Sequence, residues 1–399
     1  MSVVALARVA DAPPRSRWPV YAEDEIAAAA EVLRSGRVNA LHHGEQCRAF
    51  EAAYAQACGM PHAIAVANGT VSLEIALRAL GIGPGDEVVV TPRSFVASAS
   101  CVVSVGATPV FADVDPVSQN LTAASVAAVI GPRTRAILVV HLAGWPAGMN
   151  ELVALAEAND LKIIEDCAQA HGATLDGRPV GSFGDVASFS FCTDKIISTG
   201  GEGGLLLFRD DEVHARAWSL KDHGKQLGVM APPGPSFRWL HDSFGSNLRM
   251  TEFQAAIGRH QLAKLPGWTA VRQRNARVLD RQLADLAALR LTVPGDGIGH
   301  AYYKYYAFVR PERLRAGWSR DRIVAAAQDA GLPCQSGVCP EIYRERAFVA
   351  AGLAPPAPLP VAAELGLTSL MLPVDQTLDA DDMAVIATGL ATIVAGATA

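Results

Sequence analysis

The sequence has little of what marks nucleic-acid-binding, membrane-spanning or secreted proteins. Its 399 residues carry 34 Lys and Arg against 40 Asp and Glu, a net charge of −6, so no basic excess points to a nucleic-acid partner. Uninterrupted apolar runs fall short of the ~18 residues that a membrane-spanning helix needs. Residues 1–14 lack a basic start and a long apolar block, which argues against a secretory signal. We therefore expect a cytoplasmic protein with no nucleic-acid or membrane partner.

Cysteine is also scarce and irregularly spaced. The seven cysteines form an odd set without regular intervals, which argues against a disulfide framework. Cys167 and His171 are four residues apart, and Cys334 and Cys339 are five apart, but no second pair completes a zinc site. We expect buried thiols and no metal.

What the sequence does contain is a regular alternation of short apolar runs and helical stretches. The runs predict seven strands, at His62–Ala67, Glu87–Thr91, Pro109–Ala112, Ala136–His141, Leu161–Glu165, Val186–Phe191 and Gly204–Phe208. Helical patterns separate most of them, at Val71–Leu80, Phe95–Val105, Ala123–Ile130 and Asn150–Asn159. Strands that alternate with helices predict an α/β fold with a mostly parallel sheet covered on both faces.

The alternation fades after Asp211, and a smaller second domain is expected. The pattern predicts helices at Thr251–Leu265 and Thr269–Leu289, with a break near Pro266. A strand near Tyr302–Val309, a helix at Ser319–Ala330 and a last helix from about Asp381 follow. We expect a large domain over residues 1–265 and a smaller C-terminal α/β domain over residues 266–399.

Polar and aromatic groups gather at the ends of the predicted strands. In an open α/β sheet, ligands bind outside the carboxyl ends of the strands. Five separate segments reach that edge: Asn68-Gly69-Thr70, Phe95, His141, Asp166 and Lys195. The sequence therefore predicts a ligand site there.

Lys195 and Asp166 indicate which ligand. A lysine amine can bond an aldehyde cofactor as a Schiff base and then carry protons, while a carboxylate can keep a pyridine nitrogen protonated. An acid at the end of one buried strand and a lysine just past the next therefore favour pyridoxal phosphate. Taken singly, Lys195 would be a solvated surface lysine and Asp166 an acidic cap in a turn.

Other residues could complete the cofactor site, although each has a plainer interpretation. Gly69 and Thr70 open a helix whose N-terminus suits a phosphate, but they also fit an ordinary N-cap. Ser190 could add a hydroxyl to the phosphate, or could be only a small residue in a buried strand. Gln169 could reach the ring hydroxyl or be a loop amide, and Phe95 could stack on the ring or belong to the core.

Taken together, the motifs resemble the DegT/DnrJ/StrS family of fold-type I pyridoxal-phosphate aminotransferases, which act on nucleotide-linked keto sugars. They cover most of the chain in order and form a specific set: NGTVSLEIALRALGIGPGDEVVVTPRSFVASA, PVFADVD, VVHLAGWPAGM, IIEDCAQAHGA, VGSFGDVASFSF, the Lys195 turn with GEGG, GSNLRMTEFQAAIGRHQL and LPVAAELGLTSLMLPV. The resemblance implies a fold-type I aminotransferase with a seven-stranded sheet and a smaller C-terminal domain.

The resemblance also implies roles for single residues. Lys195 would be the Schiff-base lysine, Asp166 the partner of the pyridine nitrogen and Gln169 the ring-hydroxyl contact. Phe95 would stack on the ring, while Gly69, Thr70 and Ser190 would hold the phosphate. Asn247 would reach the phosphate in the neighbouring subunit of a homodimer. Arg249 and His223 match positions near the substrate entrance without an assigned role.

The function implied is transfer of an amino group from an L-amino acid, expected to be glutamate, to a nucleotide-linked keto sugar. The pathway would make an amino sugar for a surface polysaccharide or a glycosylated natural product. A dehydratase or aromatising enzyme of the same fold, or an aminotransferase of a cyclic polyol ketone, is the alternative. A non-catalytic regulatory protein is disfavoured because Lys195, Asp166 and the phosphate loop are all present. An extra glycine in the lysine turn and the long APPGPSFRW loop leave the substrate open.

Overall fold

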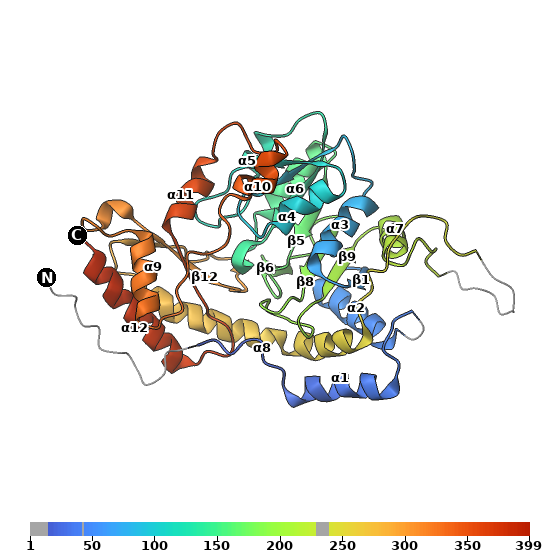
Figure 1. Cartoon of the computed structure of the whole chain (residues 1–399), viewed down its shortest axis with the longest axis horizontal. Coiled ribbons are helices and arrows are strands. Elements are labelled where there is room, and N and C mark those ends of the chain that lie inside the picture. The colour runs from blue at the N-terminus through green and yellow to red at the C-terminus, as the bar shows by residue number, and fades with distance from the viewer. Residues whose placement is uncertain (1–14, 42–43, 229–238) are drawn as a thin grey trace.

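The computed structural model describes residues 15–41, 44–228 and 239–399, and a seven-stranded sheet lies at its centre (Figure 1). The strands run in the order β1-β9-β8-β5-β4-β2-β3. Their bounds are β1 His62–Val66, β2 Glu87–Val90, β3 Thr108–Phe111, β4 Thr134–Val140, β5 Lys162–Asp166, β8 Val186–Ser190 and β9 Gly204–Phe208. Only β9 is antiparallel to its neighbours in this sheet, so the prediction of a mostly parallel seven-stranded sheet is confirmed. Residues 229–238, which include most of the predicted APPGPSFRW loop, lie outside the described residues.

Both faces of the sheet are buried, which explains why its strands are continuous apolar runs. In β4, Ala136 and Leu138 pack on one face and Ile137 and Val139 on the other, as period-two alternation requires. One face is covered by α3 (Gly69–Ala79), α4 (Ala97–Ser104) and α7 (Asp211–Lys221). The other is covered by α2 (Glu45–Cys58), α5 (Ala123–Ala127), α6 (Met149–Ala158) and the long α8 (Glu252–Leu283).

Helix α8 connects the two halves of the molecule. It runs from beneath the large sheet to the C-terminal helices, and α1 (Glu23–Ser35) packs along it (Figure 1). The predicted break near Pro266 is wrong, because α8 continues through this proline. Pro266 removes one backbone donor, but buried residues on both sides, Leu265 before it and Arg272 after it, anchor the helix to the core. The expected domain boundary at residue 265 falls within α8 and stays a prediction.

The C-terminal part carries its own antiparallel sheet. Strands β10 (Leu289–Leu291), β12 (Tyr305–Val309) and β13 (Ser369–Leu372) lie in the order β10-β12-β13. Helices α9 (Arg320–Asp329) and α12 (Ala380–Ala397) pack with α8 around a second apolar core. A third sheet joins β11 (Ile298–Gly299) to the hairpin of β6 (Thr174–Leu175) and β7 (Arg178–Pro179).

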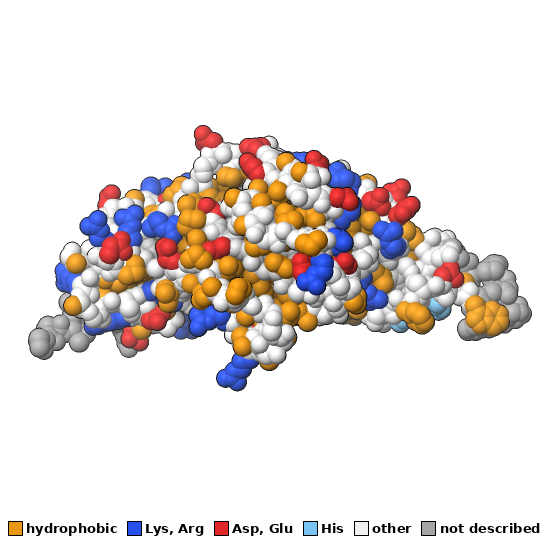
Figure 2. Space-filling model, turned by 90° about the horizontal axis from the view of Figure 1, so that it is seen from above, with side chains coloured by type: hydrophobic (Ala, Val, Ile, Leu, Met, Phe, Trp, Pro, Cys, Tyr) orange, Lys and Arg blue, Asp and Glu red, His pale blue; other side chains and the backbone are white. Residues whose placement is uncertain are grey.

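Helix α12 is long and apolar enough, by length and composition, to cross a membrane. Its apolar side chains are nevertheless used inside the protein, since Met383, Ile386, Leu390 and Ile393 are buried in the second core. The face of the molecule seen in Figure 2 carries acidic and basic side chains interspersed among apolar ones. The apolar character of α12 is therefore that of a core helix in a soluble fold.

Candidate active site

A cavity of about 500 Å³ opens at the carboxyl ends of the central strands. Seven of the eight residues that the sequence singled out for the cofactor line it: Gly69, Thr70, Phe95, Asp166, Gln169, Ser190 and Lys195. Asn68, Ser94, Ser98, Cys192, Asp194 and Glu202 are also among its walls. Asn247 does not line this cavity, and neither does His141. The alternating fold thus brings segments that are more than a hundred residues apart to one place.

Asp166 ends β5 with its carboxylate held by two donors. The Ser98 hydroxyl, in the first turn of α4, donates to Oδ2 at 2.8 Å, and the Ala168 N–H donates to Oδ1 at 3.1 Å. Burial raises the pKa of Asp166, while the Ser98 hydroxyl and the Ala168 N–H counteract part of that rise. A cation in front of the carboxylate would favour its ionised form further.

Gln169 is oriented by the loop that follows β4. Its Oε1 accepts the backbone N–H of Ala143 at 2.8 Å, which assigns the two ends of the amide. Ala143 has a left-handed backbone (φ 57°), and its carbonyl accepts the N–H of Tyr303 at 2.8 Å. The –NH₂ group of Gln169 is consequently the end left to donate toward the cavity.

The N-terminus of α3 faces the cavity at very close range to β8. Asn68 caps the helix by accepting the N–H of Val71 at 3.0 Å, and the first N–H groups of a helix have no partners within it. A Cβ on Gly69 would lie 2.5 Å from the Cβ of Ser190, so no other residue fits there. His171 supports Ser190 from behind, since its Nε2 lies 2.9 Å from the Ser190 carbonyl oxygen. The result is a small cradle of N–H and hydroxyl groups suited to a phosphate.

Lys195 is held at its backbone and approached by a carboxylate at its amine. Its carbonyl accepts the indole N–H of Trp18 at 2.7 Å, and its side chain is 13% exposed. The amine Nζ lies 3.9 Å from Oδ1 of Asp194 and 5.1 Å from the ring centre of Tyr303. Phe95 stands at the rim, 61% exposed, where its ring can cover a ligand.

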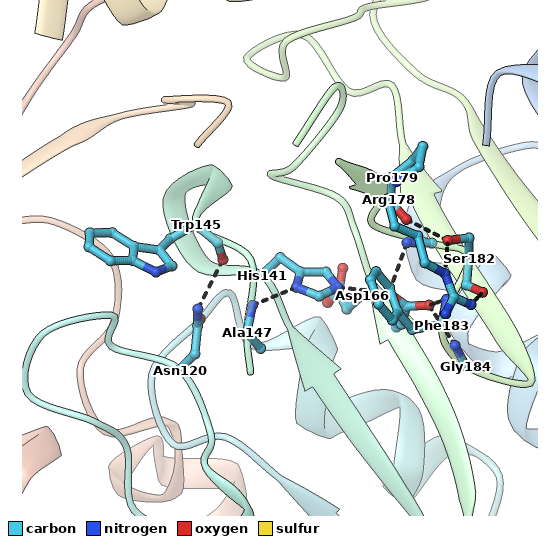
Figure 3. Close-up of polar contacts among 12 residues, drawn as sticks. Asn120, His141, Trp145, Ala147, Asp166, Arg178, Pro179, Ser182, Phe183 and Gly184 are labelled. Carbon is cyan, nitrogen blue, oxygen red and sulfur yellow. Dashed lines mark hydrogen bonds and ion pairs between the residues drawn. The ribbon is translucent and has the colours of Figure 1, made fainter. Parts of the chain in front are cut away.

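Behind the cavity, His141 and Glu165 form a buried network. Figure 3 shows the His141 ring with its backbone partner Ala147. His141, Glu165 and Cys167 offer ligand atoms within 4.8 Å of one another, which is close enough for a metal ion. His141 Nδ1 accepts the N–H of Ala147 at 3.0 Å, and its Nε2 donates to Glu165 at 3.0 Å. Glu165 also accepts the N–H groups of residues 181, 183 and 184. The His141 ring and the Glu165 carboxylate therefore already have hydrogen-bond partners. Their bonds fix the loop at Ala147 and the loop over residues 181–184 behind the cavity.

Three residues near the cavity come from the segment before α8. Asn247 pairs with Asp222 in an isolated antiparallel bridge. Arg249 Nη1 donates to Asp222 Oδ1 at 2.8 Å, and both side chains are largely buried. His223 has a left-handed backbone (φ 61°) and donates its N–H to Ser246 at 3.1 Å. These contacts fix the strand-like segment that carries Asn247, which is exposed and does not line the cavity of its own chain.

Sequence reasoning missed three residues of the site. Ser98 could have been found, since it comes three residues after Phe95 in the helix predicted over Phe95–Val105. Asp194 stands beside the lysine but has no motif of its own. Tyr303 is more than a hundred residues from Lys195, and no local pattern links the two.

The residues present fit pyridoxal phosphate. The cradle at Gly69 and Ser190 suits the phosphate, and the buried Asp166 carboxylate suits a protonated ring nitrogen. The free donor end of Gln169 suits a ring hydroxyl, and the amine of Lys195 opens into the same cavity. The donor set therefore matches each polar group of this cofactor.

Comparison with known proteins gives a consistent result. A family model for the DegT/DnrJ/EryC1/StrS aminotransferase family matches residues 19–391. The structure superposes on the aminotransferase from Psychrobacter cryohalolentis with a TM-score of 0.93 and 46% identity, covering 96% of this chain and 100% of that one. GDP-perosamine synthase from Caulobacter vibrioides is 41% identical over 287 residues, 71% of this chain and 73% of that protein. The L-glutamine:2-deoxy-scyllo-inosose aminotransferase of Streptomyces fradiae is 38% identical over 335 residues, 82% of this chain and 78% of that protein.

Proposed function

Because the chain belongs to the DegT/DnrJ/EryC1/StrS aminotransferase family, we propose that it aminates a nucleotide-linked keto sugar. The chain is an aminotransferase, and pyridoxal phosphate is its cofactor. The amino group would come from an L-amino acid, with glutamate as the expected donor, and the product would enter amino-sugar biosynthesis. The similarity to GDP-perosamine synthase, whose name describes a nucleotide-linked amino sugar, is the observation that carries this proposal.

We assign the roles of the cavity residues as follows. Lys195 bonds the cofactor, Asp166 pairs with its ring nitrogen and Gln169 donates to its ring hydroxyl. Phe95 covers the ring, while Gly69, Thr70 and Ser190 hold the phosphate. The assignment rests on their common position around the cavity.

The cofactor supplies an electron sink that lowers the barrier to removing a proton from the substrate carbon. The residues of the protein position the cofactor and transfer the proton. The Lys195 amine would take a proton from the substrate carbon as a general base and give it up again as a general acid. The Asp166 carboxylate, which Ser98 fixes in place, would pair with the ring nitrogen. The cradle at α3 would hold the phosphate.

We further propose a homodimer whose two sites are shared. Phe95 at the cavity rim is 61% exposed, and Phe244, three residues before Asn247, is 94% exposed. Large apolar side chains that are exposed in a single chain are typical of a surface that a second subunit covers. Asn247, which is exposed and does not line the cavity of its own chain, would then reach the phosphate in the partner. A cytoplasmic location remains a prediction.

An aminotransferase of a cyclic polyol ketone is the second candidate. The similarity to a 2-deoxy-scyllo-inosose aminotransferase extends over 82% of this chain, more than the 71% matched by GDP-perosamine synthase. That enzyme's name specifies L-glutamine as the donor, so glutamine belongs among the donors to be tested. A dehydratase or aromatising enzyme of the same fold is the remaining alternative.

Absorbance and product analysis test the proposal. The purified protein should show the visible band of lysine-bound pyridoxal phosphate, and glutamate or glutamine should abolish it with release of the corresponding oxo acid. Lys195→Ala should lack both the band and the activity. Nucleotide-linked keto sugars and inososes are then offered as acceptors side by side. Conversion of inososes alone would select the second candidate, and loss of water from a sugar without oxo-acid release would select a dehydratase.

A further inference from the structure

Tyr303 reaches the active site from the C-terminal half of the chain. It lies just before β12, is 8% exposed, and donates its hydroxyl to Oδ2 of Asp194. Its own backbone is fixed twice, by its N–H to the Ala143 carbonyl at 2.8 Å and by its carbonyl to Arg272 Nη1 at 3.4 Å. The phenol is therefore a rigid support that holds a flexible carboxylate in one place.

Asp194 is placed to act on the amine of Lys195. Its other oxygen, Oδ1, is 3.9 Å from Lys195 Nζ, a distance at which opposite charges attract. Burial alone would raise the pKa of Asp194, but the neighbouring Lys195 ammonium and the Tyr303 hydroxyl together lower it. The carboxylate is thus ionised at neutral pH while it faces the amine.

Asp166, a second acid in the cavity lining, has a different role. Asp166 is engaged by Ser98 and Ala168 and is placed for the ring nitrogen. The further titratable or charged groups around the amine are Cys192, Glu202, His171 and Lys304. The Lys304 amine lies 5.0 Å from the centre of the Tyr303 ring. Among the described residues, Asp194 is the acid that forms an ion pair with Lys195.

We propose that Asp194, held by Tyr303, is a positioning residue for Lys195: it pairs with the amine while the lysine is not bonded to the cofactor, and so fixes the direction of the amine. The inference rests on the proposed function, in which the freed lysine carries the proton. It also ties the C-terminal half to the chemistry, because Tyr303 orients Asp194 only while its loop stays docked on Ala143.

The test measures the lysine in the full chain loaded with pyridoxamine phosphate, where the amine is free. Acetic anhydride labelling at a fixed pH, read by peptide mass spectrometry, gives the rate at which the Lys195 amine reacts. Asp194→Asn removes the carboxylate that pairs with the amine, so the labelling rate should rise roughly threefold, a modest change because the carboxylate is partly solvated. Tyr303→Phe should raise the labelling rate by less.

The protein offers matched controls two residues along. Tyr305 donates its hydroxyl to Asp280 Oδ1 at 2.8 Å, a second tyrosine–aspartate pair outside the cavity lining. Tyr305→Phe and Asp280→Asn should leave the Lys195 labelling rate unchanged, and circular dichroism checks that each variant is folded. An unchanged labelling rate in folded Asp194→Asn, or an equal rise in Asp280→Asn, would overturn the inference. Such a result leaves the proposed function standing, whereas a visible band in Lys195→Ala refutes the function whatever Asp194 does.

Discussion

At the scale of single residues, the site depends on charges that are buried only where donors replace water. Glu165 is fully buried, and burial alone would raise its pKa. The His141 ring N–H and the backbone N–H groups of residues 181 and 184 outweigh burial, so the pKa of Glu165 is lowered. Asp166 receives fewer donors, and its pKa stays raised. Glu165 therefore has a structural role, because its hydrogen bonds are complete. Asp166 would be stabilised further by a cation bound in front of it.

Ser98→Ala tests how much Asp166 depends on its hydroxyl partner. The lost bond is one to a charged group, worth about 1.5–3 kcal/mol, so pyridoxal phosphate should bind roughly tenfold more weakly or worse. Fluorescence titration of the cofactor measures this. Ser100→Ala, the same change in the same helix and only partly buried, is the control. Equal affinity in the two variants would remove Ser98 from the site.

The buried His171 should make the folded protein less stable in acid. Burial lowers the pKa of His171 to about 3 from an ordinary 6.5, and the hydrogen bond to the Ser190 carbonyl offsets only part of that fall. Below pH 6.5 this histidine is protonated in the unfolded chain but not in the folded chain. The free energy of unfolding therefore falls by about 1.4 kcal/mol for each pH unit below 6.5. Urea unfolding between pH 7 and pH 5 measures the slope. His171→Gln should flatten it, and His260→Gln, at a partly exposed ring, should not.

At the scale of elements, the junction of α3 with β8 is the tightest feature of the site. Gly69→Ala would place a methyl group 2.5 Å from the Cβ of Ser190, so the helix start must move away from the strand. We expect cofactor affinity to fall more than tenfold, measured by equilibrium dialysis, with a loss of about 1–3 kcal/mol in stability. Gly83→Ala is the control, since its Cβ would meet only the Val105 carbonyl oxygen at 3.7 Å. Similar affinities for both variants would argue against a phosphate cradle at α3.

The elements also show what a sequence can and cannot predict here. All seven strands of the large sheet were predictable because burial on both faces leaves apolar runs with turns between them. The continuity of α8 through Pro266 was not, because packing on both sides of the proline outweighs a local helix-breaking preference. Tyr303 was not predictable either, since its contact with Asp194 exists only after β12 has paired within the C-terminal sheet.

At the scale of the whole molecule, the C-terminal half reaches the active site through Tyr303, which bonds Asp194 in the cavity wall. The large sheet provides the cradle and Asp166, and the loop before β12 provides Tyr303. Helix α8 belongs to the cores of both parts, so their relative position is set by one continuous element. The direction of the lysine amine is consequently coupled to the docking of the C-terminal half.

Mixed dimers test whether the sites are shared between subunits. If Asn247 serves the partner's phosphate, a dimer of Lys195→Ala with Asn247→Ala contains one site with a native lysine and a native asparagine. Each variant alone should be nearly inactive, while co-expression should restore roughly one quarter of wild-type activity by random pairing. Lys195→Ala with Asp166→Asn is the matched control, because both residues belong to one chain's site and no native site can form. Failure of the first pair to regain activity above the second would place Asn247 in its own chain's site or in none, and the shared-site dimer would be rejected.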